Sequence, residues 1–146
     1  MLERETWIEE LWKRIAEVDG VKFTDRNPKD PPAIGNLPAI LLFERSDMIE
    51  KRSMRGAYPI HSRLMQVALE AFVLGTSEAS VKKELAIFAK AVKKSVFRDN
   101  NLGGTCSEFR ETETGPVLRP KMGPPVAGVT MFFEVRYVEN VALLFV

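Results

Sequence analysis

The stretch that decides the fold is Val126–Tyr137, VAGVTMFFEVRY, in which alternate residues from Ala127 onward are apolar. An extended strand points successive side chains to opposite faces, so this row would form a core-facing stripe that includes Phe133. The other row carries Glu134 but also Phe132, and it is too apolar for a fully solvated face. The stretch therefore predicts a long strand in a sheet that is covered on both sides.

Composition narrows the class of protein around that strand. The chain has 146 residues, and 21 Lys and Arg balance 20 Asp and Glu to a net charge of +1, so no global field attracts nucleic acid or an anionic membrane. Cys106 is the single cysteine and His61 the single histidine, which excludes an internal disulfide and a multi-histidine metal site. No stretch resembles a signal peptide or a membrane span. We expect one soluble, cytosolic domain over residues 1–146, without a cofactor.

Two segments have the apolar spacing of amphipathic helices. From Glu3 to Val18, apolar residues recur every three or four positions, and Asp19-Gly20 then favours a helix end. Ser77 or Ser80 is a suitable N-cap for a second helix, whose predicted buried stripe ends at Val96 or Phe97.

Strands are predicted between and after the helices. Short runs at Val21–Thr24 and Ala39–Glu44 precede Pro59–Gly75, which alternates like a strand although its apolar residues would also line a helix. The aromatic and β-branched residues near its ends favour a strand. Cys106–Thr114 alternates as an edge strand does, and the closing strand runs from Val126 to about Glu139.

The remaining segments are predicted loops: Asp25–Pro38, Ser46–Gly56, which we expect to be an exposed connection, and Gly115–Pro125. The sum is an α+β fold, with a mostly antiparallel sheet of four to five strands packed with two main α-helices in the order α-β-β-β-α-β-β.

Residues that could carry chemistry are few. His61 has no neighbouring Asp, Ser or Cys in a recognised arrangement, and Cys106 follows a tight Gly-Gly turn without a positioned base. Glu108, Glu111 and Glu113 could pair for acid-base work, but they alternate with other residues on an exposed strand, where solvation is the simpler interpretation. The sequence therefore favours a protein that is not an enzyme.

Several segments together resemble the tail terminator (tail completion) proteins of long-tailed bacteriophages and prophages. The first helix closes on Asp19-Gly20-Val21, and a strand opens at Leu37-Pro38-Ala39-Ile40. The second helix runs into FRDNNLGG at residues 97–104, and the last strand carries PVAGVT at 125–130 and FEVRY at 133–137. The resemblance spans nearly the whole chain through order and spacing.

This resemblance implies a structural protein of the virion tail, assembled in the bacterial cytoplasm. Such a subunit forms a homo-hexameric ring that caps the tail tube, stops polymerisation of the tube protein and presents a head-joining surface. Its partners would be other copies of itself, the major tail (tube) protein and a head-completion or connector protein, with DNA passing through the lumen. The alternatives are another head-tail connector or minor tail component, or a small-molecule binding domain or enzyme using His61 or the Glu108–Glu113 strand.

Two groups of residues are candidate contacts under this interpretation. Tube or head contacts are expected in the charged segment after the second strand, at Arg45, Lys51, Arg52, Arg55 and Tyr58. Of these, Lys51, Arg52 and Arg55 are also expected to face DNA in the lumen. Subunit-interface contacts are expected in the late loop, on the exposed row of the last strand and in the apolar tail, at Leu118, Arg119, Met122, Phe132, Leu143, Leu144 and Phe145.

Overall fold

The computed structural model describes residues 3–56, 58–115 and 125–140. Two helices, α1 (Glu3–Ala16) and α2 (Glu78–Val96), combine with five strands and a short 3-10 turn, η1 (Ile34–Asn36). The strands are β1 (Phe23–Arg26), β2 (Ala39–Arg55), β3 (Tyr58–Leu74), β4 (Glu108–Thr114) and β5 (Val126–Asn140). The α+β class, the five strands and the order α-β-β-β-α-β-β are as predicted.

The five strands form one sheet in the order β1-β2-β3-β5-β4. Every neighbouring pair is antiparallel except β1 and β2, which run parallel. β5 therefore lies between β3 and β4, and its predicted stripe from Ala127 to Tyr137 is buried throughout. The alternation at Pro59–Gly75 does belong to a strand, since β3 pairs with β5 over its full apolar length.

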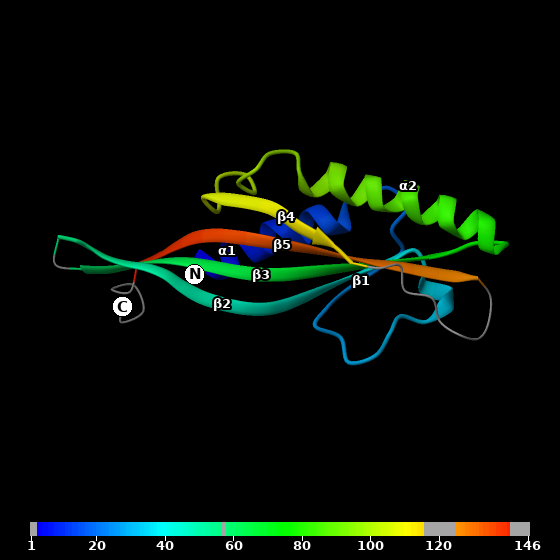
Figure 1. The fold of residues 1–146 in the computed structure, drawn as a ribbon, viewed down its shortest axis with the longest axis horizontal. Helices are drawn as coiled ribbons and strands as arrows, with labels where there is room; N and C mark the ends of the chain where they lie inside the picture. The colour runs from blue at the N-terminus through cyan, green and yellow to red at the C-terminus, as the bar shows by residue number, and fades with distance from the viewer. Residues whose placement is uncertain (1–2, 57, 116–124, 141–146) are drawn as a thin grey trace.

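Both helices pack on the same face of the sheet, and the core lies between them and that face (Figure 1). Trp7 of α1 and Phe88 of α2 join one cluster with the inward rows of β3 and β5. No helix packs on the second face in the described part of the chain, but that face is partly covered there, since Ala39, Leu41 and Ala68 lie on it and are buried. The apolar Phe132 on that face is half-buried by side chains of the sheet itself, among them Arg45.

The β2–β3 hairpin is the largest departure from expectation. Ser46–Gly56 was predicted as a connection, but β2 continues to Arg55 and pairs with β3 to the turn at Gly56, whose φ is +63°. Seventeen residues at about 3.3 Å each make strands of about 55 Å. The far part of the hairpin, with the end of β5, extends past both helices as a narrow arm (Figure 1).

Two β-bulges interrupt the pairing of β2 with β3. One lies between Glu44 and Asp47 and the other between Ile49 and Lys51. In each, β2 holds one residue more than β3, which adds local twist and bends the strand. The bulges mark the passage from the body of the sheet to the arm.

The remaining boundaries differ little from the predictions. β1 begins at Phe23 and not at Val21, and the Asp25–Pro38 loop contains η1. α2 begins with a capping box, in which the Ser77 hydroxyl accepts from the Ser80 N–H and the Ser80 hydroxyl accepts from the Ser77 N–H. Within the described ranges, neither helix has the length and apolar character needed to cross a membrane.

Candidate interaction surfaces

The side chains that could support catalysis are separated by the fold. His61 lies on the helix-side face of β3, with Nδ1 3.6 Å from a carboxylate oxygen of Glu139. Cys106 is buried before β4, and burial raises the pKa of its thiol to about 11. Among the described residues, no side-chain base is hydrogen-bonded to that thiol. The arrangement does not build an activated nucleophile.

The three carboxylates of β4 do not face one another. Glu108 and Glu113 share the open face of the sheet, whereas Glu111 points to the helix side, where it accepts a hydrogen bond from Nζ of Lys93 at 3.1 Å. Glu108 is bound to Arg136 at 2.9 Å. No group of three metal-ligating side chains occurs in residues 3–56, 58–115 and 125–140.

The open face of the sheet carries an apolar strip and a row of ion pairs. The Arg45 guanidinium lies 5.2 Å from the centre of the Phe132 ring, a cation–π contact between β2 and β5. Phe72 of β3 lies over Gly128 of β5, where an added Cβ would be 2.6 Å from two ring carbons. Gly128 is thus the residue that lets this aromatic ring lie flat on the sheet.

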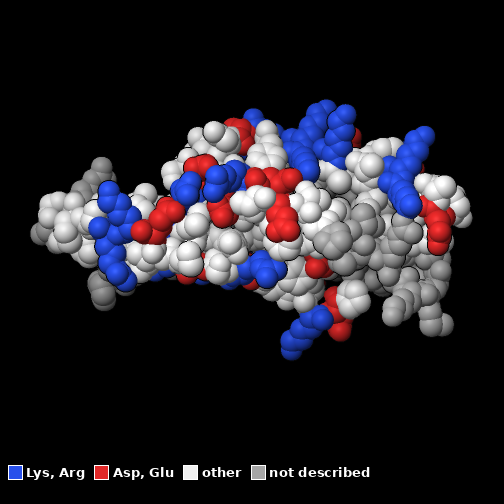
Figure 2. All heavy atoms as spheres, viewed as in Figure 1, with Lys and Arg blue, Asp and Glu red and all other residues white. Residues whose placement is uncertain are grey.

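The ion pairs on this face join three strands. Arg136 of β5 contacts Glu50 of β2 at 3.1 Å and Glu108 of β4 at 2.9 Å, and Arg110 contacts Glu134 at 2.7 Å. Figure 2, in the view where the strands lie in front of α1, shows basic and acidic side chains alternating across this surface. The positive and negative side chains of this row balance one another, so the row does not select a charged partner.

A second polar cluster fixes the base of the arm to α1 on the helix side. Asp47 accepts a hydrogen bond from the Tyr137 hydroxyl at 2.6 Å and forms ion pairs with Arg4 and Arg63. Burial, followed by the hydrogen bond to Asp47, raises the pKa of Tyr137 above its ordinary value. Arg63 also contacts Glu139 at 3.1 Å, so three strands and α1 meet here.

Beyond this cluster, the arm is basic and partly apolar. Lys51 and Arg52 are exposed and have no ion pair within the described part of the chain. Met54 and Val138 expose 63% and 47% of their surface, although large apolar side chains are usually buried, and Met48, next to Asp47 at the base of the arm, exposes 55%. Figure 2 shows the basic group at the arm end of the molecule. An arm of this composition has polar and apolar atoms available for a partner.

A groove lies at the opposite end of the molecule, between α2 and the end of β3. Its lining includes Asp19, Pro38, Leu74, Glu84, Ile87 and Phe88. Leu74 is 40% exposed and Ile87 is 55% exposed, which makes the rim apolar. Asp19 and Glu84 are exposed and form no ion pair with any described residue.

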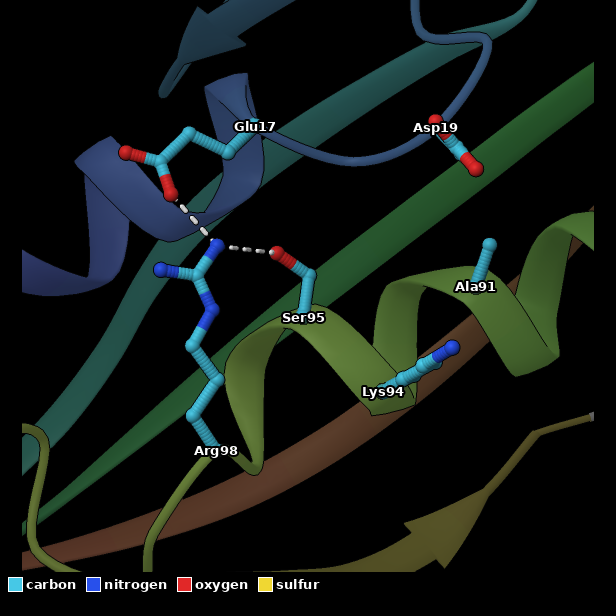
Figure 3. Close-up of a pocket in the computed structure, with 6 residues that line it drawn as sticks. All are labelled: Glu17, Asp19, Ala91, Lys94, Ser95 and Arg98. Carbon is cyan, nitrogen blue, oxygen red and sulfur yellow. Dashed lines mark hydrogen bonds and ion pairs between the residues drawn. The ribbon is translucent and has the colours of Figure 1, made fainter.

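A neighbouring hollow between the helices is closed by internal bonds. Figure 3 shows Arg98 pointing to Glu17, which directly follows α1 and forms an ion pair with it, and to the Ser95 hydroxyl at 3.3 Å. Ser95 donates in turn to the Arg14 carbonyl at 2.6 Å. Since these groups bind one another, the hollow serves to join the C-terminal turns of α1 and α2.

The loop after α2 is held by a buried cation. Arg14, whose side chain is only 4% exposed, binds both oxygens of Asp99 and donates to the Val96 carbonyl. The hydrogen bond from Arg14, and then the backbone N–H of Gly103, lower the pKa of Asp99 to about 2. These interactions hold the FRDNNLGG segment in place, so the segment has a structural role within the described residues.

The predicted contact residues fall into three sets. Lys51 and Arg52 lie together on the arm, whereas Arg45 lies on the open face beside Phe132, a residue predicted for a different interface. Arg55 ends β2 and Tyr58 begins β3, but their side chains are not described. The other predictions lie outside the described residues: Leu118, Arg119, Met122, Leu143, Leu144 and Phe145.

Sequence reasoning missed the exposed apolar residues. Met48 and Met54 interrupt a charged segment, and Ile87 lies among the lysines of α2, so each departs from its surroundings. These departures from the surrounding sequence are the signal by which the exposed residues could have been identified. Val138 was noticeable in the same way, as an apolar residue on the more polar row of the last strand, whereas Leu74 gave no signal because it adjoins the apolar Val73.

The fold of the chain is similar to that of a known protein, although its sequence matches no known family. No protein-family model matches the chain, and no curated protein matches it. Among solved structures, the fold is similar to a chain of "Virion of native gene transfer agent (GTA) particle", with 11% sequence identity and a TM-score of 0.50. The match covers 88% of this chain and 91% of that one. At this identity the similarity is one of fold.

Proposed function

We propose that the protein is a structural component of a phage-like virion, and more finely a tail terminator that caps the tail tube as a ring. The observation that carries the proposal is the fold match to a virion chain, which extends over 91% of that chain. It agrees with the sequence resemblance to tail terminators, which was drawn from residues over the same length. Fold alone does not determine function, so the surfaces must be consistent with it.

The surfaces support a role in assembly. One sheet face has no helix packed on it in the described residues, and a hairpin arm presents exposed Met54 beside Arg52. Exposed apolar groups with a polar rim are typical of protein–protein contacts. Under the proposal, copies join in a closed ring, one ring face binds the tube protein, and the other binds a head-completion or connector protein.

Tube binding tests this function directly. Purified protein should add to the ends of preformed tail tubes and stop their elongation when it is mixed with the polymerising tube protein, as seen by electron microscopy. Rings of six subunits should appear at the capped ends. Protein that leaves tube length unchanged and sediments instead with head fractions would refute the terminator role and favour a connector.

A further inference from the structure

Most of the large apolar side chains exposed in the described residues lie toward the two ends of the molecule. Met54 and Val138 belong to the arm, and Leu74 and Ile87 border the groove beside α2. Ile34 belongs to η1 in the loop that leads to Pro38 of the groove. The exception is Met48, which lies opposite Leu64, nearer the middle of the sheet.

The two ends are too far apart to meet within one chain. Met54 pairs with Pro59 at the start of β3, and the groove residue Leu74 ends the same strand. Fifteen residues of extended strand separate Pro59 from Leu74, a distance of about 50 Å. Contact between the arm and the groove therefore requires two molecules.

The ends also differ in shape and in charge. The arm projects and carries Lys51 and Arg52, which have no ion pair among the described residues, whereas the groove is hollow and is lined by Asp19 and Glu84, which have none either. Unpaired charges of opposite sign at two complementary sites favour and orient association. The lysines of α2 lie on other rows of that helix, so the acidic contact is on the side of the groove that faces Asp19.

We infer that the β2–β3 arm of one copy docks in the groove between α2 and the end of β3 of a second copy. Met54 would fill the apolar part beside Leu74 and Ile87, and Arg52, on the same face of the arm, would approach Glu84 and Asp19. The two contacting surfaces differ, so the association is head-to-tail and continues from copy to copy until a ring closes. The inference deepens the proposed function, on which its biological purpose rests, by naming the surfaces through which copies join.

Disulfide trapping tests the contact even if association is weak. One preparation carries Met54→Cys and a second, enlarged by a tag, carries Ile87→Cys; both positions are exposed, and Cys106 is buried. Mild oxidation of the mixture should give a disulfide between the two preparations. The matched control replaces Met54→Cys by Glu113→Cys, which is exposed on β4 away from the arm. A yield no higher than that of the control would overturn the inference.

Charge reversal tests the orientation. Arg52→Glu or Glu84→Arg alone should weaken self-association about tenfold or more, because each places like charges together, and the two changes in one chain should restore it. Mixing Arg52→Glu protein with Glu84→Arg protein places opposite charges at both kinds of contact between unlike molecules, so sedimentation of the mixture should recover the oligomers that each protein alone lacks. Equal association of all variants, or failure of the double variant to recover, would contradict the docking.

These outcomes separate the inference from the proposed function. Rings on tail tubes without trapping between arm and groove would refute the docking and leave the terminator role standing. Charge-dependent oligomers that the disulfide traps but that never bind tail tubes would support the docking and refute the terminator role.

Discussion

Replacing Gly128 by alanine should destabilise the protein through the Phe72 ring. The new Cβ would be 2.6 Å from Cδ1 and Cε1 of Phe72 and 3.2 Å from the Ala71 carbonyl oxygen. Real Cβ atoms do not approach carbon so closely, so the ring must move, and crowding of this kind costs about 1–3 kcal/mol. Loss of glycine flexibility in the unfolded chain offsets about 0.5–1 kcal/mol. The midpoints of these two ranges leave a net loss of about 1 kcal/mol, or about 2–4 °C in Tm for a chain of this length.

A double-mutant cycle isolates that contact. Urea unfolding is measured for the wild type, Gly128→Ala, Phe72→Ala and the double variant, with circular dichroism as the probe. In the Phe72→Ala background the methyl group has no ring to meet, so Gly128→Ala should be neutral or slightly stabilising. If Gly128→Ala cost the same free energy in both backgrounds, the Phe72 ring would not be the cause and the reasoning would fail.

Three further predictions concern the loop after α2. Arg14→Met should lower the free energy of unfolding by about 3 kcal/mol, because it removes a buried cation and leaves its partners unpaired. Arg98→Met, at an exposed ion pair, should lower it by less than about 1 kcal/mol. Equal urea midpoints for the two variants would contradict this expectation. Asp99 has a folded-state pKa of about 2, below its ordinary 3.8, so its stabilising contribution is present above pH 4 and is lost as the pH falls toward 2. The stability difference between wild type and Asp99→Asn should shrink over that window, and a constant difference would argue against the paired carboxylate. At pH 8 the Cys106 thiol, with its pKa raised to about 11, should react with a disulfide reagent at least about 100-fold more slowly in folded protein than in denaturant; similar rates would show that it is accessible.

The long strands were predictable because their side chains enter the core. β5 and β3 show apolar alternation where they face the helices, as at Met131 and Leu69, and burial makes that alternation visible in the sequence. The helices were found for the same reason. The outer half of β2 could not be found in this way, because both of its faces near Lys51 are exposed and its backbone ladder with β3 holds it extended.

The sequence pattern also could not show which face of the sheet the helices cover. Phe132 indicated that a helix or another subunit covers the second face of β5, but the Arg45 guanidinium lies over its ring, a contact that depends on the order of the strands. Likewise, Lys51 and Arg52 were correctly singled out as exposed cations, whereas their distance from the groove at Glu84 follows only from the fold. Sequence periodicity reports burial within an element and carries little about pairing between elements.

The two bulges of β2 constrain how this chain can change in length during evolution. Each places one extra residue of β2 opposite β3, and the pairing continues in step before and after it. Deletion of Ser46 would remove one bulge and leave Asp47 opposite Met65, on the face where it contacts Tyr137. A one-residue deletion elsewhere in β2 would shift the pairing on one side of the deletion by one residue and move those side chains to the other face. Relatives are therefore expected to gain or lose single residues at the two bulges and to keep the length of the rest of β2.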